Sequence, residues 1–262
     1  MMEQLLELSK LPAFILIFVR VTAFFVTIPL FSYRNVPTQH KIGFSFFLAW
    51  IMFYTVDIPV VIVNEMFIGL VLKEAIVGLA IGFMAYLIIT AVQIAGGFID
   101  FQMGFAIANV IDPQTGVQSP LIGQYLYTIT LLLLLAVDGH HLLIDGIFYS
   151  YEMIPLDQLY IDFGNEPFIL FVIETFNQMF MVAFLMSVPI VGCLFLVDVA
   201  LGIVARTVPQ LNVFVVGLPL KILVSFVVIL ISFSMFTILI ENLFDLMLVS
   251  MRDLMQLMGE TG

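Results

Sequence analysis

The sequence predicts an all-α membrane protein, and three observations support this fold class. Of the 262 residues, 63% are hydrophobic and only 10% are charged, whereas a soluble domain has about 45 to 50% apolar and about 25% charged residues. The apolar residues form runs of about 20, the length that an α-helix needs to cross a bilayer. Prolines and glycines interrupt some runs, which predicts kinked or broken helices. We therefore expect about six long apolar helices.

The first of these helices follows an acidic N-terminal segment, in which Glu3 and Glu7 stand where a signal peptide would have basic residues. We therefore expect a retained first helix. Pro189 lies inside the fifth apolar run and predicts a kink there. The six runs cover residues 11–31, 44–63, 66–95, 125–137 with an extension past His141, 168–205, and 213–240.

Charge and cysteine content exclude several kinds of function. The net charge of −11 argues against nucleic acid as a partner, because such a partner would require a basic face. The single cysteine, Cys193, allows no internal disulfide and no multi-cysteine metal site. No G-x-S-x-G, H-E-x-x-H or P-loop motif is present, so we expect neither an enzyme nor a bound cofactor.

Several ionisable residues lie within the apolar runs, where an unpaired charge costs about 2.5 to 3.5 kcal/mol on insertion scales. They can mark an ion pathway or a wet subunit interface, or they can form interhelical pairs and snorkel to the headgroups. Lys73 and Glu74 are adjacent, so we expect them to point to different sides of a helix. The full set is Arg20, Lys73, Glu74, Glu174, Asp198, Lys221 and Glu241.

Two short motifs have specific but weak implications. Gly78 and Gly82 form a G-x-x-x-G pattern, which permits close approach of another helix. In DGHHLLIDG, residues 138–146, His140 and His141 lie between two aspartates. Adjacent side chains diverge on a helix, so we expect a hydrated helix end near an interface there and no metal site.

Two stretches combine proline, amides and glycine beside apolar runs. They are IDFQMGFAIANVIDPQTGVQSP, residues 99–120, and ARTVPQLNVFVVGLPLK, residues 205–221. Non-helical backbone at membrane depth is tolerated only where protein or water covers it. The second stretch predicts a fixed turn in which Pro209 stops a helix and Gln210 and Asn212 bond the freed carbonyls.

These two stretches, together with DGHHLLIDGIFYSY, resemble the FliR family of flagellar export-gate proteins, and the resemblance covers essentially the whole chain in order of motifs. It implies a membrane subunit of the flagellar type III protein export gate in the basal body, assembled with FliP, FliQ and FlhB homologues. Unfolded flagellar proteins would pass through this gate. The resemblance also implies one unit over residues 1–262, with a FliP-like part over about 1–165 and a FliQ-like part over about 166–262.

The resemblance further implies that the central loop plugs the closed pore through an apolar tip. The plug residues would be Phe105, Ile107, Asn109, Val110, Ile111, Asp112, Pro113 and Gln114. If the helices pack in a helical assembly and not in lipid alone, their charges lie at subunit contacts. The expected interface residues are Lys73, Glu74, Glu174, Asp198, Arg206, Pro209, Gln210, Asn212 and Lys221.

Two other functions are consistent with part of the sequence. A virulence-type secretion system uses related gate subunits, although the sequence DPQTGVQSP favours the flagellar branch. A secondary transporter would suit broken helices and charges near the membrane midplane, but such proteins often carry inverted repeats, and none is visible in the two halves.

Overall fold

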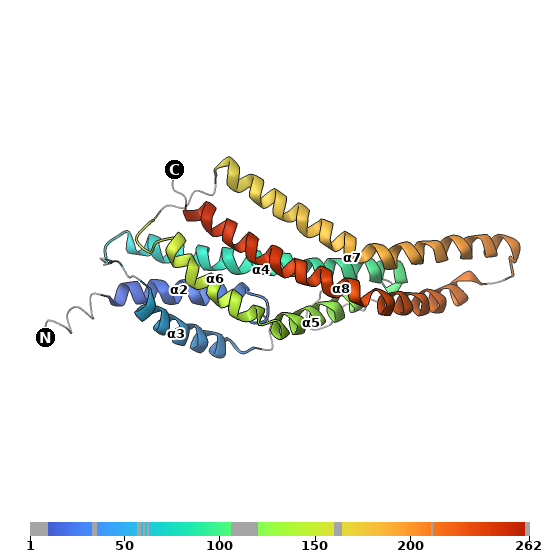
Figure 1. Ribbon diagram of the computed structural model, residues 1–262, viewed down its shortest axis with the longest axis horizontal. Coiled ribbons are helices and arrows are strands. Elements are labelled where there is room, and N and C mark those ends of the chain that lie inside the picture. Colours follow the sequence, from blue (N-terminus) through green and yellow to red (C-terminus); the bar gives the residue numbers. More distant parts are fainter. Residues whose placement is uncertain are drawn as a thin grey trace. The chain divides into compact units, whose positions relative to one another are not determined.

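The computed structural model describes residues 10–32, 36–56, 59, 61, 63–105, 120–159, 164–210 and 212–259 (Figure 1). Every regular element among these residues is a helix, which confirms the predicted all-α fold class. The described helices are α2 (Leu11–Thr27), α3 (Thr38–Thr55), α4 (Phe67–Met103), α5 (Leu121–Ala136), α6 (Gly139–Met153), α7 (Glu166–Thr207) and α8 (Val213–Gly259).

Each predicted apolar run contains a helix, but several boundaries differ. The second helix ends at Thr55, because Pro59 follows closely and cannot continue it. The fourth run is divided into α5 and α6. The break falls beside Asp138, whose φ of 56° is in the left-handed region. The helix of the sixth predicted run, α8, extends to Gly259, well beyond the predicted end at Ile240.

Three of the described helices are long and apolar enough to cross a membrane. They are α4, α7 and α8, with mean hydropathy values of 2.4, 2.6 and 2.7 in their most apolar windows. A fourth crossing arises if α5 and α6 are counted as one broken span. Two prolines, Pro189 in α7 and Pro219 in α8, lie inside these helices without ending them.

The chain divides into two compact units that are interleaved in sequence. Unit 1 comprises Met1–Ile88, Leu134–Thr175 and Asp245–Gly262, and unit 2 comprises Ile89–Leu133 and Phe176–Phe244. The long helices α4, α7 and α8 each contribute to both units.

In unit 1, α2 packs against both α3 and α4. The Phe14 ring on α2 meets the rings of Phe46, Trp50 and Phe53 on α3 edge to face, at centroid distances of 5.5 to 5.9 Å. Edge-to-face pairs of this kind add to the energy of apolar burial.

The contact between α2 and α4 depends on two glycines of α4. A side chain at Gly78 would collide with the carbonyl oxygen of Arg20, and one at Gly82 would collide with the Thr27 hydroxyl. The close helix approach predicted from the G-x-x-x-G pattern is therefore confirmed, and the approaching helix is α2.

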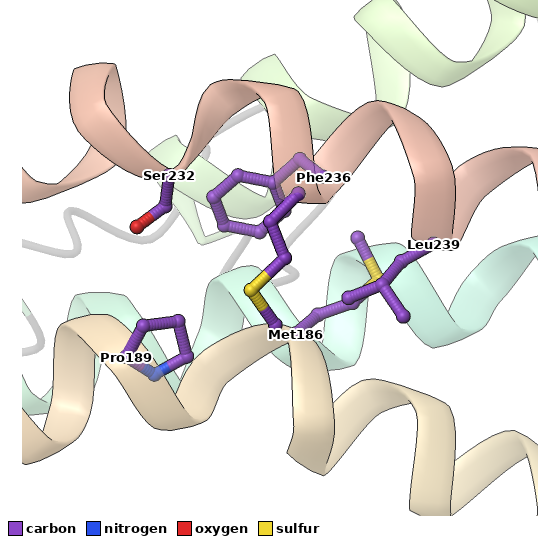
Figure 2. A pocket seen from close by; sticks show the side chains of 6 residues that line it. Met186, Pro189, Ser232, Phe236 and Leu239 are labelled. Atoms are coloured by element: carbon purple, nitrogen blue, oxygen red, sulfur yellow. The ribbon is translucent and has the colours of Figure 1, made fainter.

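In unit 2, α7 and α8 form a helical hairpin, and the described residues between them are 208–210 and 212 (Figure 1). Met186 of α7 and Phe236 and Leu239 of α8 point toward one another beside Pro189 (Figure 2). The gap that these side chains line is too narrow to hold a water molecule. Packing of this density fixes the register of the two helices.

Candidate functional site

A charged cluster is buried inside unit 1. Arg20 on α2 donates Nε to Glu74 Oε2 and Nη2 to Glu74 Oε1, the latter at 3.0 Å. Lys73 Nζ lies 2.5 Å from Glu74 Oε1, and the side chains of Arg20 and Glu74 are 0% exposed. The Arg20 guanidinium also lies 4.1 Å from the centre of the Tyr151 ring. The expectation that adjacent Lys73 and Glu74 point to different sides was wrong, because the long Lys73 side chain reaches back to the Glu74 carboxylate.

Main-chain carbonyl groups at the end of α6 complete this cluster. Arg20 donates to the carbonyls of Ser150 and Ile154, each at 2.8 Å, and Lys73 donates to that of Pro155 at 2.8 Å. One carboxylate therefore faces two cations, and the partial negative charges of the carbonyls offset the excess positive charge. The cluster joins α2, α4 and the chain after α6. It leaves Lys73 and Glu74 with almost no surface for a partner subunit.

A second, partly exposed cluster lies in unit 2. Asp198 of α7 forms an ion pair with Lys221 of α8 at 2.8 Å, and Gln102 of α4 donates to Asp198 Oδ2 at 2.9 Å. The Asp198 side chain is 41% exposed and the Lys221 side chain 16%. A groove of about 260 Å³ borders this pair, lined also by Gly202, Gly217 and Phe214.

Asp198 and Lys221 were predicted as site residues, and the structure brings them together. Gln102 was not predicted with them, although its amide is one of the polar groups that set the central stretch apart.

The remaining predicted interface residues are all exposed and do not form one cluster. Glu174 lies in the unit 1 part of α7, whereas Arg206, Pro209, Gln210 and Asn212 lie around the turn between α7 and α8.

The turn itself differs in one detail from the prediction. Asn212 Oδ1 accepts hydrogen bonds from the main-chain N–H groups of Phe214, at 3.1 Å, and Val215, at 3.4 Å. The Asn212 side chain therefore caps α8 by accepting hydrogen bonds from N–H groups of the first turn of that helix. We had expected this side chain to bond carbonyls of the preceding helix instead.

The predicted plug falls almost entirely outside the described residues. Of its members, the structure describes Phe105, which follows Gly104 at the end of α4. The φ of Gly104 is 88°, a conformation that favours glycine, and it ends the helix there. The predicted plug residues outside the described ranges are Ile107, Asn109, Val110, Ile111, Asp112, Pro113 and Gln114.

The two ends of this loop are held together in unit 2. The buried Asp100 carboxylate of α4 accepts the main-chain N–H of Ile122, the second residue of α5, at 3.0 Å. A side chain at Gly96 of α4 would collide with the backbone of Gly123 in α5. The last turns of α4 and the first turn of α5 thus form a tightly packed base for residues 106–119.

The helices of unit 2 also carry much exposed apolar surface. In their most apolar windows α7 and α8 are only 28% and 17% buried, compared with 61% for α4. Large side chains such as Phe195, Ile203, Phe214, Leu230 and Ile231 are at least 60% exposed. Surface of this kind requires lipid or other protein chains as its surroundings.

The paired histidines at the start of α6 do not behave as expected. The ring centroids of His140 and His141 are only 4.1 Å apart, so the prediction that the two side chains diverge was wrong. Both lie in the first turn, where Asp138 is also close to His141.

Comparison with known proteins is consistent with this arrangement. The family described as "Bacterial export proteins, family 1" matches residues 11–247. The flagellar biosynthetic protein FliR of Bacillus subtilis is 59% identical over 249 residues, which are 95% of this chain and 96% of that protein. FliR of Escherichia coli is 28% identical over 79% of this chain and 78% of its own length, and FliR of Aquifex aeolicus 26% over 93% and 94%. The chain is therefore a membrane-associated member of the bacterial export protein family 1, of the FliR type.

Proposed function

We propose that the chain is a subunit of the flagellar type III export gate, where it forms a pore with FliP, FliQ and FlhB homologues in the basal body. Unfolded flagellar proteins pass through this pore, and the central loop of this chain closes it when no substrate is present. Family membership supports a role in flagellar export. The pore, its partners and the plug are our proposal.

The observation that carries the proposal is the packed base of the central loop. A plug must move when a substrate passes, yet it must return to one place. The Asp100 to Ile122 hydrogen bond and the contact of Gly96 with Gly123 hold the end of α4 against the start of α5, the two helices that residues 106–119 connect. A loop that only joined two helices would need no such base.

The residues within the loop suit a seal. Ile107, Val110 and Ile111 offer a bulky apolar tip, and a short apolar constriction holds back ions by dewetting. Asp112, Gln114 and Thr115 can satisfy the loop backbone with local hydrogen bonds. A polar loop of the same length would remain hydrated and would conduct.

The exposed apolar faces of α7 and α8 support assembly with other chains. The cluster of Asp198, Lys221 and Gln102 lies among these faces and is partly exposed. Its polar groups suit a wet subunit contact better than a lipid-facing surface. We assign Asp198, Lys221, Glu174, Arg206, Pro209, Gln210 and Asn212 to the interface. Lys73 and Glu74 are omitted because they are satisfied within the chain.

We further propose that residues 1–165 correspond to a FliP-like part and residues 166–262 to a FliQ-like part. The second part contains α7 and α8, which are the two least buried of the membrane-length helices. A two-helix hairpin that buries little of its own surface suits a subunit that stacks beside similar hairpins.

Co-purification tests the proposed assembly. The chain is produced alone and together with FliP and FliQ homologues, and each sample is extracted in mild detergent and separated by size. We expect one stable complex in the second case, with aggregation or degradation in the first. A secondary transporter would instead behave as a monodisperse protein without partners and would carry a small solute in liposomes. That outcome would contradict the export-gate proposal.

A further inference from the structure

Three potential metal ligands meet at the break between α5 and α6, within unit 1. One donor atom each from Asp138, His140 and His141 lies within 4.8 Å of the others. His141 Nδ1 is 3.7 Å from Asp138 Oδ1, which is too long for a hydrogen bond. The three groups are therefore close without being satisfied by one another.

The hydrogen bonding of His140 adds an independent observation. Its Nδ1 atom is buried and has no hydrogen-bond partner, a state shared among the described residues only by the Thr22 hydroxyl. Buried polar atoms usually have a hydrogen-bond partner, because a buried polar atom without one costs about 1 to 3 kcal/mol. A metal ion bound to His140 Nδ1 would supply the partner that this nitrogen lacks.

The backbone holds the three residues in this arrangement. Asp138 is the N-cap residue of α6, with a φ of 56°, and its carboxylate oxygen Oδ1 lies 3.7 Å from His141 Nδ1. Gly139 then follows, where a side chain would collide with Leu134 of α5. The two imidazole rings directly follow this turn, and their centroids are 4.1 Å apart.

The ligand atoms lie within 4.8 Å of one another, which is farther apart than a bound metal requires. Bonds of about 2.0 to 2.2 Å to Zn²⁺ place tetrahedral ligand atoms roughly 3.4 Å apart. The side chains of Asp138 and His141 are 78% and 67% exposed, so rotation can close the remaining distance. Two imidazoles and one carboxylate suit Zn²⁺ and similar transition-metal ions better than Ca²⁺ or Mg²⁺, which prefer oxygen ligands.

We propose that Asp138, His140 and His141 form a site for a divalent transition-metal ion such as Zn²⁺, with a fourth position open to water. The ion holds the first turn of α6 against the break that precedes it. This site is independent of the proposed pore and plug, because it depends only on residues of unit 1.

Metal titration of the full chain, purified without a polyhistidine tag and in complex with its FliP and FliQ homologues, tests the site. We expect Zn²⁺ to bind this chain at one ion per copy with micromolar affinity or tighter, and Co²⁺ to give the visible spectrum of a mixed nitrogen and oxygen site. His141→Gln and Asp138→Asn should each weaken Zn²⁺ binding by about tenfold or more. Asparagine tolerates the left-handed backbone, so the second variant preserves the turn.

His40→Gln is the matched control, because it removes the one histidine of the chain that is outside the proposed site. His40 lies on the exposed start of α3. All variants are measured in complexes with the same unaltered partners. Any Zn²⁺ that the partners bind is then the same in every sample and drops out of the comparison between variants. Zn²⁺ should also raise the thermal midpoint of the wild type and of His40→Gln, but not of His141→Gln. Equal binding by all variants, or binding only at millimolar Zn²⁺, would overturn the proposal.

Discussion

At the scale of single residues, the cluster around Arg20 is the most constrained part of the molecule. Two buried cations share the Glu74 carboxylate, and main-chain carbonyl groups offset the remaining positive charge. Removing one member of a buried pair leaves an uncompensated charge and costs about 3 to 5 kcal/mol. The three members of this cluster should therefore differ strongly in how well they tolerate substitution.

We predict that Glu74→Gln destabilises the chain more than Lys73→Met. The first change leaves Arg20 and Lys73 as two buried cations without a carboxylate, at a cost of about 3 to 5 kcal/mol. The second leaves the Arg20 to Glu74 pair intact. The measurement is the temperature at which half of the detergent-solubilised complex with FliP and FliQ homologues ceases to be monodisperse.

Glu152→Gln is the control for this comparison, because Glu152 lies on α6 in the same unit and is exposed. Its effect should stay within about 0.5 kcal/mol. If Glu74→Gln melts like Glu152→Gln, the cluster contributes nothing to stability and its charges serve another purpose.

At the scale of elements, counting apolar runs locates the helices but not their ends. The last run stops at Glu241, yet α8 continues to Gly259. Met247, Met251, Met255 and Met258 recur at helical spacing and are each at most 3% exposed. A search for continuous hydrophobicity misses such an amphipathic extension, whereas a search for period 3.6 could have found it.

The break between α5 and α6 shows a different limit of the sequence. Asp138 adopts a left-handed conformation that its residue type allows but does not demand. The Asp138–Gly139 dipeptide is a turn signal, but tertiary packing decides whether a helix continues through it. The close contact between Gly78 of α4 and α2 could be predicted, since small residues at i and i+4 have a direct packing consequence.

We predict opposite effects for two neighbouring glycines of α4. Gly96→Ala inserts a methyl group against the Gly123 backbone and should destabilise the base of the central loop. Gly97→Ala meets its nearest neighbour, Pro120 Cγ, at 4.0 Å, an ordinary contact. It should therefore stabilise α4 by about 0.4 to 1 kcal/mol by restricting the unfolded chain. Thermal midpoints of the two variants, measured in parallel, should move in opposite directions. A shared direction would mean that α4 and α5 are not packed closely here.

We also predict that the turn between α7 and α8 is needed for assembly. Pro209 and Gln210 are exposed, so replacing both with alanine removes little from the chain itself. Their loss should lower the yield of complex with FliP and FliQ homologues, while the complexes that do form should conduct normally. Size-exclusion yield and conductance are measured on the same preparation. Normal yield with increased ion leakage would place this turn in the gate and not at a subunit contact.

At the scale of the whole molecule, the sequence predicts the class of protein better than the arrangement of its charges. Composition and run length suffice for an all-α membrane protein. Which charges pair within the chain depends on contacts between residues distant in sequence, such as Arg20 with Glu74 and Asp198 with Lys221. No periodicity encodes such contacts. The charged residues assigned to interfaces therefore included Lys73 and Glu74, which the fold satisfies internally.

The central loop is where the proposed function can be tested most directly. Its base is fixed by Asp100 and Gly96, so shortening the loop should leave α4 and α5 packed and the complex assembled. We predict that deleting residues 107–117 gives an assembled but leaky complex. Cells that carry it should lose membrane potential or admit small molecules that are otherwise excluded.

Point substitutions distinguish a seal from a simple effect of loop length. Val110→Gly with Ile111→Gly keeps the length and removes the apolar tip, so its leakage should fall between that of the intact and the deleted complex. Leu132→Gly with Leu133→Gly makes the same chemical change on α5, where Leu132 is 61% exposed, and should not open the pore. Conductance across membranes that contain each complex, normalised to the amount assembled, separates the cases. Equal conductance in the intact, deleted and tip-substituted complexes would show that residues 107–117 are an ordinary connection and that the seal is formed elsewhere.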